Sequence, residues 1–410
     1  MTLSKLKIHI LRFTTLLLLS LPVSMQAQHS DRAMRKLVRS NFELAAKQYK
    51  LLGAQTPADV MPRSYVAAEK KLITSNTSWW TSGFFPGSLW YIYEATGDTA
   101  IRAEAERRLA ILEKEKYHTR DHDLGFMIFC SFGNALRVTG DEKYKETIFT
   151  AAETLIKRYR PAMRSIQSWD SSAAFRSPVI IDNLMNLEML CWVSDETREP
   201  KYKVIAIDHA NTTMRNHYRP DFSAYHVIDY DPVTGKVAAK KTAQGYAPES
   251  AWARGQSWGL YGFTMMYRCT EDTNYLRQAR GIAQFLLKHP NLPKDKIPYW
   301  DYNAPDIPNT YRDVSAASIM ASALLDLSRY VEGAEKEEYV KTARTILQNL
   351  SGSRYRNKPG ENGGFILKHS VGAIPYKSEV DVPLTYADYY FLEALHRYKA
   401  WYLELPPKAN

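Results

Sequence analysis

With 410 residues, 45% of them hydrophobic, the chain can bury a large core as one big domain or two ordinary ones. Its formal net charge is +10, and three of these ten charges lie in the first 27 residues, which leaves +7 on residues 28–410. This excess is spread along the chain without a block of like charge. Nucleic acid is therefore not an expected partner, whereas a small anionic substrate is compatible with the charge.

Residues 1–27 have the pattern of a secretory signal peptide. Lys5, Lys7 and Arg12 precede the apolar run TTLLLLSLPVSM, and a small-residue cleavage pattern ends at Ala27. The run is short for a membrane span, which makes an anchoring helix the weaker alternative, and no cysteine stands near the cleavage point to carry a lipid. We therefore expect an exported protein that has no membrane attachment after cleavage.

Three cysteines, Cys130, Cys191 and Cys269, stand in apolar or helical surroundings. Their number is odd, and no pair has the spacing of a metal site. We expect buried thiols, with neither a disulfide framework nor a metal centre.

The rest of the chain is dominated by helical periodicity, and the helices come in pairs. In each pair an apolar segment is followed by a short breaker and then by a polar-faced helix with an apolar stripe. The breakers are EATGDTA, RVTGDEK, RCTEDTN and YVEGAEK, and SDETREPKY has the same position in a further pair. The polar-faced helices cover residues 100–117, 143–159, 203–218, 275–289 and 338–350.

This spacing predicts about six pairs, or roughly twelve helices. An apolar inner ring inside a polar outer ring is typical of a closed toroid, the all-α (α/α)6 barrel. An open superhelix would need end helices with polar outer faces, and the final helix, residues 385–403, is too apolar for that. Because no Pro- or Ser-rich linker divides the chain, we expect residues 28–410 to form a single domain.

Long connections interrupt the helical pattern and hold much of the Trp, Tyr, His and Asp content. Long aromatic loops on a rigid scaffold are where function usually lies. In one of them, residues 222–242, apolar residues alternate on either side of the turn sequence DPVTG, which predicts a small β-hairpin.

Two aspartates stand where a helix would favour an apolar residue. Asp123, in DHDLGFMIF, precedes an inner helix, where N-capping and a functional role are both open. Asp182, in SPVIIDNLMNLEML, falls in the first turn of another inner helix, with Pro178 expected at the first helical position. A carboxyl group desolvated inside an apolar ring has a raised pKa, which suits a general acid near neutral pH.

Residue types common in sugar-binding sites surround these acids. Indole rings offer flat apolar platforms, and histidine and glutamine side chains offer hydrogen bonds to hydroxyls. Arg254, framed by Trp252 and Trp258, either meets a substrate carboxylate or is held by a carboxylate of the site. Each type alone is more often structural, but together they favour an anionic carbohydrate site. The candidates are Trp79, Trp80, Trp90, Trp169, Trp252, Trp258, Trp300, His122, His226, Gln244, Gln256 and Arg254.

The chain contains HDLGFM, IIDNLMNLEML, the hairpin pattern H-x-V-x-D-Y-D-P-x-T-G, Q-G-Y-x-x-x-S-x-W-A-R-G-Q-x-W-G-L-Y-G-F, RDVSAASIMASALLDL and YADYYFLEALHR. In combination these motifs resemble the unsaturated glucuronyl hydrolases of glycoside hydrolase family 88, over nearly all of residues 28–410. The resemblance implies an (α/α)6 barrel, no metal or organic cofactor, and most simply a periplasmic location. It also implies an exo-acting enzyme that removes the 4,5-unsaturated uronic acid of lyase-generated glycosaminoglycan-type disaccharides by hydrating its C4=C5 double bond.

By the same resemblance, Asp182 is the general acid/base and Asp123 the essential second carboxylate, whose charge would help keep Asp182 protonated. Trp80 is similar to the aromatic platform, with Trp79 as the alternative register. His226, Gln244, Trp252, Arg254 and Trp258 fall on positions around the substrate, and His122 joins them as a hydrogen-bonding candidate. Relatives that act on sulfated disaccharides use hydroxyls and a basic side chain near the loop HSVGAIPYKSEVD, where the candidates are Ser370, Lys377 and Ser378.

Two other functions are open. Unsaturated rhamnogalacturonyl hydrolases, which act on pectin fragments, share the barrel, but Gln-Ser-Trp follows Arg-Gly here, where Asn-Gly-Trp is expected in that family. A non-catalytic periplasmic glycan-binding protein on the same toroid would explain the tryptophans and Arg254. It would give no reason for an acid inside an apolar helix.

Overall fold

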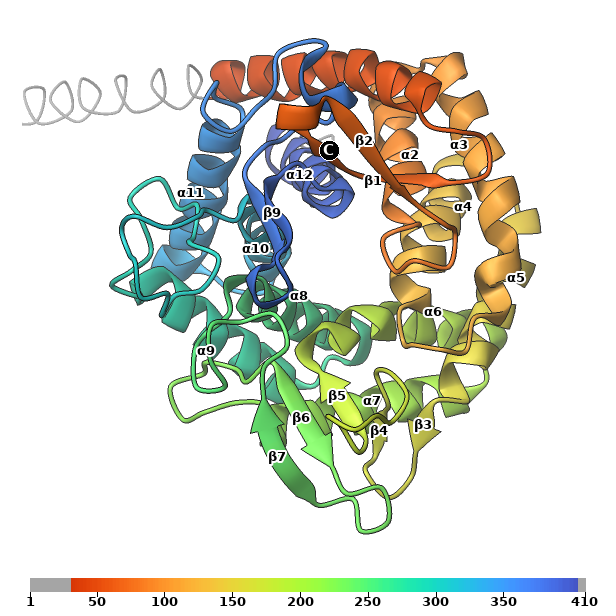
Figure 1. Ribbon diagram of the computed structural model, residues 1–410, viewed down its shortest axis with the longest axis vertical. Helices are drawn as coiled ribbons and strands as arrows, with labels where there is room; N and C mark the ends of the chain where they lie inside the picture. The colour runs from red at the N-terminus through yellow and green to blue at the C-terminus, as the bar shows by residue number, and fades with distance from the viewer. Residues whose placement is uncertain (1–30, 405–410) are drawn as a thin grey trace, which may run out of the picture.

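The computed structural model describes residues 31–404, so the expected signal peptide, residues 1–27, lies outside the described residues. Residues 31–55 form a helix, and the later helices are arranged in two layers as a ring that the chain follows once around (Figure 1). None of the helices in residues 31–404 is both long enough and apolar enough to cross a membrane.

The inner layer of the described ring has six segments. Neighbouring segments pack against one another in chain order, and the last packs against the first, which closes the ring. The predicted (α/α)6 barrel is therefore confirmed, and the open superhelix is wrong. The segments are α2 (Phe84–Thr96), η3 with α4 (Gly125–Gly133 and Asn134–Thr139), η4 with α6 (Ile181–Asn186 and Leu187–Thr197), α8 (Ala253–Thr270), α10 (Val314–Leu327) and α12 (Thr385–Tyr398).

Five outer helices each pack on the inner segment that precedes them. The helix of residues 31–55 is the outer partner at the point of closure, because Tyr49 donates a hydrogen bond to Asp388 of α12 at 3.3 Å and stacks on Phe85 of α2 at 5.3 Å. The five are α3 (Thr99–Leu112), α5 (Lys143–Ile156), α7 (Pro200–Asn216), α9 (Thr273–Lys288) and α11 (Gly333–Leu350).

The predicted breakers form the tight turns between inner and outer helices. Between α2 and α3, Gly97 adopts a left-handed conformation with φ of +70°. Asp98 then caps α3, since its carboxylate accepts the backbone N–H groups of Ala100 at 3.1 Å and Ile101 at 3.4 Å. These local signals reverse the chain after each inner helix.

Short antiparallel sheets occupy the connections between helices. They are β1–β2 (Met61–Val66 and Lys71–Ser75), β3–β4 (Tyr159–Arg160 and Ser165–Ile166), β5–β6–β7 (Pro178–Ile180, Val227–Tyr230 and Val237–Lys241) and β8–β9 (Ser370–Ala373 and Ser378–Val382). Short helical turns complete the connections: η1 (Ala67–Glu69), η2 (Glu113–Tyr117), η5 (Glu361–Gly364) and η6 (Ile374–Tyr376). The segment η7 (Lys399–Leu403) continues α12.

The predicted hairpin of residues 222–242 is present as β6–β7, with Gly235 at φ of +68° in its turn. Pro178 does not begin a helix, contrary to the sequence-based expectation. It begins β5 and lies opposite Asp229 of β6, and the helix starts only at Ile181. The β-branched residues after Pro178 favour this strand once β6 is available as a partner.

A layer of aromatic side chains fills the middle of the barrel. Phe84, Phe126, Trp258 and Tyr390, from four inner segments, form a closed circuit of ring contacts with centroid separations of 5.2–5.9 Å. All four are buried. The layer separates the two ends of the barrel, and each end has its own cavity.

Candidate active site

One cavity, with a volume of about 370 Å³, lies at the end of the barrel where the inner helices begin. Its walls come from the segments that lead into these helices and from the β1–β2 and β8–β9 hairpins, which lie beside the opening of the ring in Figure 1. The lining residues are Arg63, Trp79, Trp80, His122, Asp123, Trp169, Ile180, Asp182, Gln244, Arg254, Gly372, Ala373, Tyr376, Ser378, Glu379 and Tyr386.

Asp182 lies in the first turn of η4, as expected, and its side chain faces this cavity. The residue is buried, and its Oδ2 has no hydrogen-bond partner within residues 31–404. Burial raises the pKa of Asp182 to about 6, against the opposing charge of Arg254. Asp182 therefore keeps its proton to a higher pH than an exposed aspartate does, and that proton is available to a bound molecule.

Asp123 lies just before η3 and lines the same cavity. The N–H group of Phe126, which a capping Asp123 would accept, is donated to Asn186 Oδ1 at 3.1 Å instead, so the capping alternative is wrong. Asn186 donates to Nδ1 of His122 at 3.4 Å, which leaves the His122 proton on Nε2, 3.6 Å from Asp123 Oδ1. Burial lowers the pKa of His122 to about 4, so this ring is neutral.

The pKa of Asp123 is raised well above its usual value by burial, and then by the charges of Asp121 and Asp182. Asp123 therefore keeps its proton to a higher pH than an exposed aspartate does. From the sequence we expected the charge of Asp123 to help keep Asp182 protonated. Burial is instead the cause that raises the pKa of Asp182.

A third carboxylate, which the sequence analysis did not single out, lies behind Asp123. Asp121 Oδ1 accepts the backbone N–H of Asp123 at 3.1 Å, and its Oδ2 lies 2.8 Å from Nε2 of His118. Although burial lowers the pKa of His118, its hydrogen bonds to Asp121 and Glu115 raise it to about 9. Asp121 is thus an ionised group fixed beside Asp123, and the Asp-x-Asp spacing was the available sequence signal.

His226 directs an N–H group at Asp182. Its Nδ1 accepts the backbone N–H groups of Ala243 at 3.1 Å and Gln244 at 3.2 Å, so the ring proton lies on Nε2. Nε2 is 3.8 Å from Asp182 Oδ2. Burial, followed by the charge of Arg254, holds the pKa of His226 well below its usual value, which keeps the ring neutral.

Arg254 is buried at the start of α8 and is held by the protein on two sides. Its terminal nitrogens donate to the carbonyl oxygens of Val371 and Gly372 in β8 and to Oε1 of Gln244, and Nη1 lies 3.5 Å from Asp313 Oδ2. Of the two sequence-based alternatives, the structure places the guanidinium against a carboxylate of the protein. Its Nε has no partner within residues 31–404, and the side chain still lines the cavity.

Trp252, Trp258 and Gln256 do not line the cavity, which corrects the expectation that two indoles frame a sugar ring. Trp252 is buried and stacks on His226 with a centroid separation of 4.4 Å. Trp258 belongs to the aromatic layer, and Gln256 exchanges hydrogen bonds with the backbone of Ala224 at 2.7 and 3.1 Å. These three residues support the site from behind.

The two neighbouring indoles Trp79 and Trp80 both line the cavity, at different depths. Trp80 is half-buried and lies 5.0 Å from the ring of Tyr386, so it forms an inner wall. Trp79 is 37% exposed at the rim, with the guanidinium of Arg63 over its ring at 4.3 Å. Arg63 also pairs with Glu379 at 2.6 Å. The sequence analysis missed this rim of Arg63 and Glu379.

Only one of the three candidates in the C-terminal loop lines the cavity. Ser378 does so, with its hydroxyl 3.4 Å from a terminal nitrogen of Arg63. Ser370 is buried at the start of β8, and Lys377 is exposed in the turn between β8 and β9 at φ of +51°, so neither reaches the cavity. The basic side chain at this mouth is Arg63 instead.

Of the three remaining candidate tryptophans, one lines the cavity and two do not. Trp169 lines the cavity, whereas Trp90 is packed within α2 and Trp300 packs on Val371. Cys130, Cys191 and Cys269 are free thiols. Across residues 31–404, no group of three or more His, Cys, Asp or Glu side chains is arranged to hold a metal ion.

Comparisons with known proteins agree with this geometry. The model of Glycosyl Hydrolase Family 88 matches residues 57–402. The chain is 42% identical over 374 residues to the unsaturated glucuronyl hydrolase of Formosa agariphila, covering 91% of this chain and 93% of that protein. It is 34% identical over 338 residues to the unsaturated chondroitin disaccharide hydrolase of Streptococcus agalactiae, covering 81% and 84%. The crystal structure of an unsaturated glucuronyl hydrolase specific for heparin is similar with a TM-score of 0.86 and 47% identity, covering 89% of this chain and 97% of that one.

Proposed function

The chain belongs to glycosyl hydrolase family 88, and we propose that it removes the 4,5-unsaturated uronic acid from lyase-generated glycosaminoglycan-type disaccharides. It is a glycoside hydrolase, and its substrate is a small anionic oligosaccharide. One observation carries the assignment of roles: the buried Asp182, with a free carboxyl oxygen and a raised pKa, faces a cavity that it shares with Asp123.

The chemistry starts from the C4=C5 double bond of the unsaturated uronate. Asp182 delivers its proton to C4, positive charge develops at C5 and the ring oxygen, and water adds at C5. The Asp182 carboxylate, now basic, takes the proton that this water loses. The resulting hemiketal opens to a ketone and releases the neighbouring sugar. Since water attacks C5, the carboxylate separations that distinguish retaining from inverting glycosidases do not apply.

The surrounding groups supply orientation. Asp123 shares a hydrogen bond with a sugar hydroxyl, and His226 donates its Nε2 proton toward Asp182 or the attacking water. Arg254 lines the cavity, and its Nε–H has no partner within residues 31–404, so in this scheme that N–H meets the uronate carboxylate. Trp80 gives the sugar ring an apolar wall. No step in this scheme needs a metal or an organic cofactor.

The test is the loss of ultraviolet absorbance when the conjugated double bond of an unsaturated disaccharide is hydrated. We expect turnover of disaccharides from heparin or chondroitin, the substrates that appear in the names of two relatives. Turnover of unsaturated rhamnogalacturonan fragments alone would favour the rhamnogalacturonyl hydrolases. Binding of the disaccharides without absorbance loss would favour a glycan-binding protein.

We also propose that the protein is exported by cleavage after Ala27 and works in the periplasm. The support is the sequence pattern of residues 1–27. Mass spectrometry of the protein from its native cells should give a chain that begins at Gln28. A native chain that begins at Met1 would contradict the proposal.

A further inference from the structure

A second cavity, with a volume of about 430 Å³, opens at the other end of the barrel. Most of its residues come from the later parts of the inner helices, whereas the first cavity uses their beginnings. Gly125 and Met185 are the exceptions, because they stand near the starts of η3 and η4. On α12, for example, Tyr386 lines the first cavity and Arg397 the second, and at 1.5 Å per residue they lie roughly 16 Å apart along the helix. The two cavities have no lining residue in common, and Tyr390 of the aromatic layer lines the second one.

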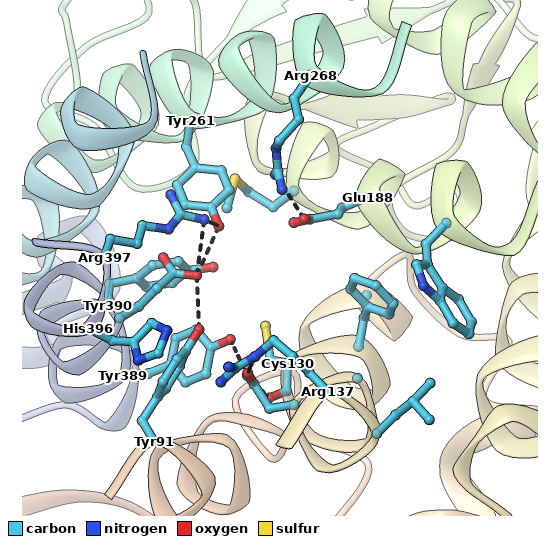
Figure 2. A pocket seen from close by; sticks show the side chains of 18 of the residues that line it. Tyr91, Cys130, Arg137, Glu188, Tyr261, Arg268, Tyr389, Tyr390, His396 and Arg397 are labelled. Carbon is cyan, nitrogen blue, oxygen red and sulfur yellow. Dashed lines mark hydrogen bonds and ion pairs between the residues drawn. The ribbon is translucent and has the colours of Figure 1, made fainter. Parts of the chain in front are cut away.

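One wall of the second cavity is a buried network around Glu393 of α12 (Figure 2). Its Oε1 accepts the hydroxyl protons of Tyr261 at 3.0 Å and Tyr91 at 3.3 Å, and its Oε2 accepts that of Ser322 at 2.5 Å. Arg397 donates to the Tyr261 hydroxyl at 2.6 Å. The network fixes tyrosine and arginine side chains from α2, α8 and α12 at the edge of one space.

The opposite side of the cavity is apolar. Phe129 and Trp192 lie 5.8 Å apart between ring centroids, and Leu136 and Met185 line the cavity beside them. Leu136 and Trp192 are half-buried, so part of this wall is open to solvent. The cavity is therefore amphipathic, with hydrogen-bonding groups on one wall and apolar surface on the other.

Its charges balance one another. Burial lowers the pKa of His396, which keeps that side chain neutral, and burial raises the pKa of the Cys130 thiol. Each guanidinium of the lining lies against a carboxylate: Arg137 with Glu94 at 2.8 Å, Arg268 with Glu188 at 2.8 Å and Arg397 with Glu393 at 3.3 Å. Within residues 31–404 every guanidinium group of this lining has a carboxylate partner, so the cavity has no evident preference for an anion.

One strong hydrogen-bonding group in this wall is still weakly engaged. The hydroxyl of Tyr390 points into the cavity in Figure 2 and has the neutral thiol of Cys130 as its neighbour. A thiol is a poor hydrogen-bond partner, so a ligand oxygen would replace it favourably. One oxygen of Glu188 receives Arg268, and the same carboxylate can accept further hydrogen bonds from hydroxyls.

We propose that this second cavity binds a neutral pyranose sugar, either a free hexose or N-acetylhexosamine or the end unit of an uncharged oligosaccharide. A pyranose ring has an apolar C–H face that fits the wall of Phe129 and Trp192 and a hydroxyl edge that fits the wall of Tyr390 and Glu188. Cavities of about 300 Å³ and larger hold small ligands. The proposal does not depend on the catalytic assignment, because the aromatic layer separates the two sites.

The experiment is a titration of the full protein with N-acetylglucosamine, followed by saturation-transfer NMR, for the wild type and four variants. Leu136→Trp fills the second cavity, Tyr390→Phe removes only its hydroxyl, Asp182→Asn alters the first cavity, and Trp80→Ala opens it.

We expect the wild type, Asp182→Asn and Trp80→Ala to bind N-acetylglucosamine alike. Binding to Tyr390→Phe should be about fivefold weaker, because one hydrogen bond is lost, and binding to Leu136→Trp should be at least about tenfold weaker. Glucuronate should not displace the neutral sugar.

Three results would overturn the proposal: no binding of N-acetylglucosamine or glucose to the wild type, binding that is lost in Trp80→Ala but kept in Leu136→Trp, or binding that neither Leu136→Trp nor Tyr390→Phe weakens. A thermal melt shows whether each variant is folded. Because the binding readout and the turnover readout are separate, a failure of the proposed hydrolase function would leave the sugar titration interpretable.

Discussion

The two ends of the barrel are built from the same inner helices but differ in how their buried polar atoms are paired. At the end where the helices begin, Asp182 Oδ2, His226 Nε2 and Arg254 Nε are buried without a hydrogen-bond partner within residues 31–404. At the other end both oxygens of Glu393 have partners. Unpaired buried polar atoms are costly unless a bound molecule meets them. The first end is therefore adapted to chemistry on a charged substrate, and the second to holding an uncharged one.

The largest expected effect is that of Asp182→Asn, which should remove turnover without unfolding the protein. Asparagine has nearly the same shape, but it cannot deliver a proton, so the rate should fall by a factor of about 10² to 10⁴, or about 3 to 5 kcal/mol of barrier. The melting temperature should hold or rise, because a desolvated carboxyl group is removed. The turnover rate is measured on an unsaturated disaccharide, and the melting temperature is measured in a thermal melt.

The matched control is Asp195→Asn, which alters an exposed aspartate paired with Lys203 at 2.5 Å. It should be close to normal in rate and stability. If Asp182→Asn keeps more than a small fraction of the wild-type rate, or is inactive only because it is unfolded, Asp182 is not the general acid.

Arg254→Lys should be the next most damaging change. One ammonium group cannot serve the carbonyls of Val371 and Gly372 together with Asp313, and it offers no Nε–H to a substrate carboxylate. We expect kcat/KM to fall about tenfold to hundredfold, the worth of one or two charge-assisted hydrogen bonds. The melting temperature should also fall. Wild-type kcat/KM together with a lowered melting temperature would make Arg254 purely structural.

The pH dependence should follow Asp182. Its proton must be present for the reaction, and its pKa is about 6, so kcat/KM should fall by about tenfold per pH unit above that value. In the unfolded chain the pKa of the same group is about 3.9. The contribution of its protonation to the free energy of unfolding is therefore fully present below that pH, and it is lost as the pH rises through 6. Asp182→Asn should abolish this component of the stability profile. A kcat/KM that is flat from pH 5 to 8 would contradict the assignment.

A smaller effect is expected for Asp121→Asn, which tests how Asp123 is positioned. The substitution removes the charge beside Asp123 and the partner of protonated His118. We expect kcat to fall about fivefold to tenfold, the worth of one hydrogen bond, with KM little changed. The pKa of Asp123 should decrease, because a like charge no longer opposes its ionisation. A purely structural role would lower the melting temperature and leave the pH–rate profile where it was.

The smallest expected effect on turnover is that of a substitution in the second cavity. Leu136→Trp, at the second end of the barrel, should leave turnover of the unsaturated disaccharide within about twofold of wild type, because distant sites act independently. Steady-state rates on the folded variant measure this. A large loss of turnover would show that the aromatic layer couples the two cavities.

The ring architecture could be predicted from the sequence because its signals are local. Apolar stripes at helical spacing define the helices, and breakers such as Gly97 with Asp98 reverse the chain wherever they occur. Asp123 and Asp182 were recognisable for a similar reason, since a carboxyl group in an apolar segment is conspicuous in the sequence itself. The family motifs add the reaction type.

The position of a side chain along the barrel axis was not available from the sequence. Trp252, Trp258 and Gln256 stand within one motif, yet none of them lines the cavity, whereas Arg254 between them does. Pro178 looked like the start of a helix until β6 provided a strand partner. Arg63 and Glu379, which are far apart in the chain, meet at the rim only because two hairpins lie side by side there.

The sequence by itself therefore determined the closed ring of paired helices and the two inward acids, because both depend on neighbours within a few residues. Only the tertiary structure decided which side chains face the cavity, that the pKa values of both acids are raised, and that a second cavity exists. These properties depend on burial and on contacts between residues distant in the chain. Burial and then the charge of Asp121 raise the pKa of Asp123, and the Glu393 network joins α12 to α2 and α8, whose tyrosines are more than a hundred residues away.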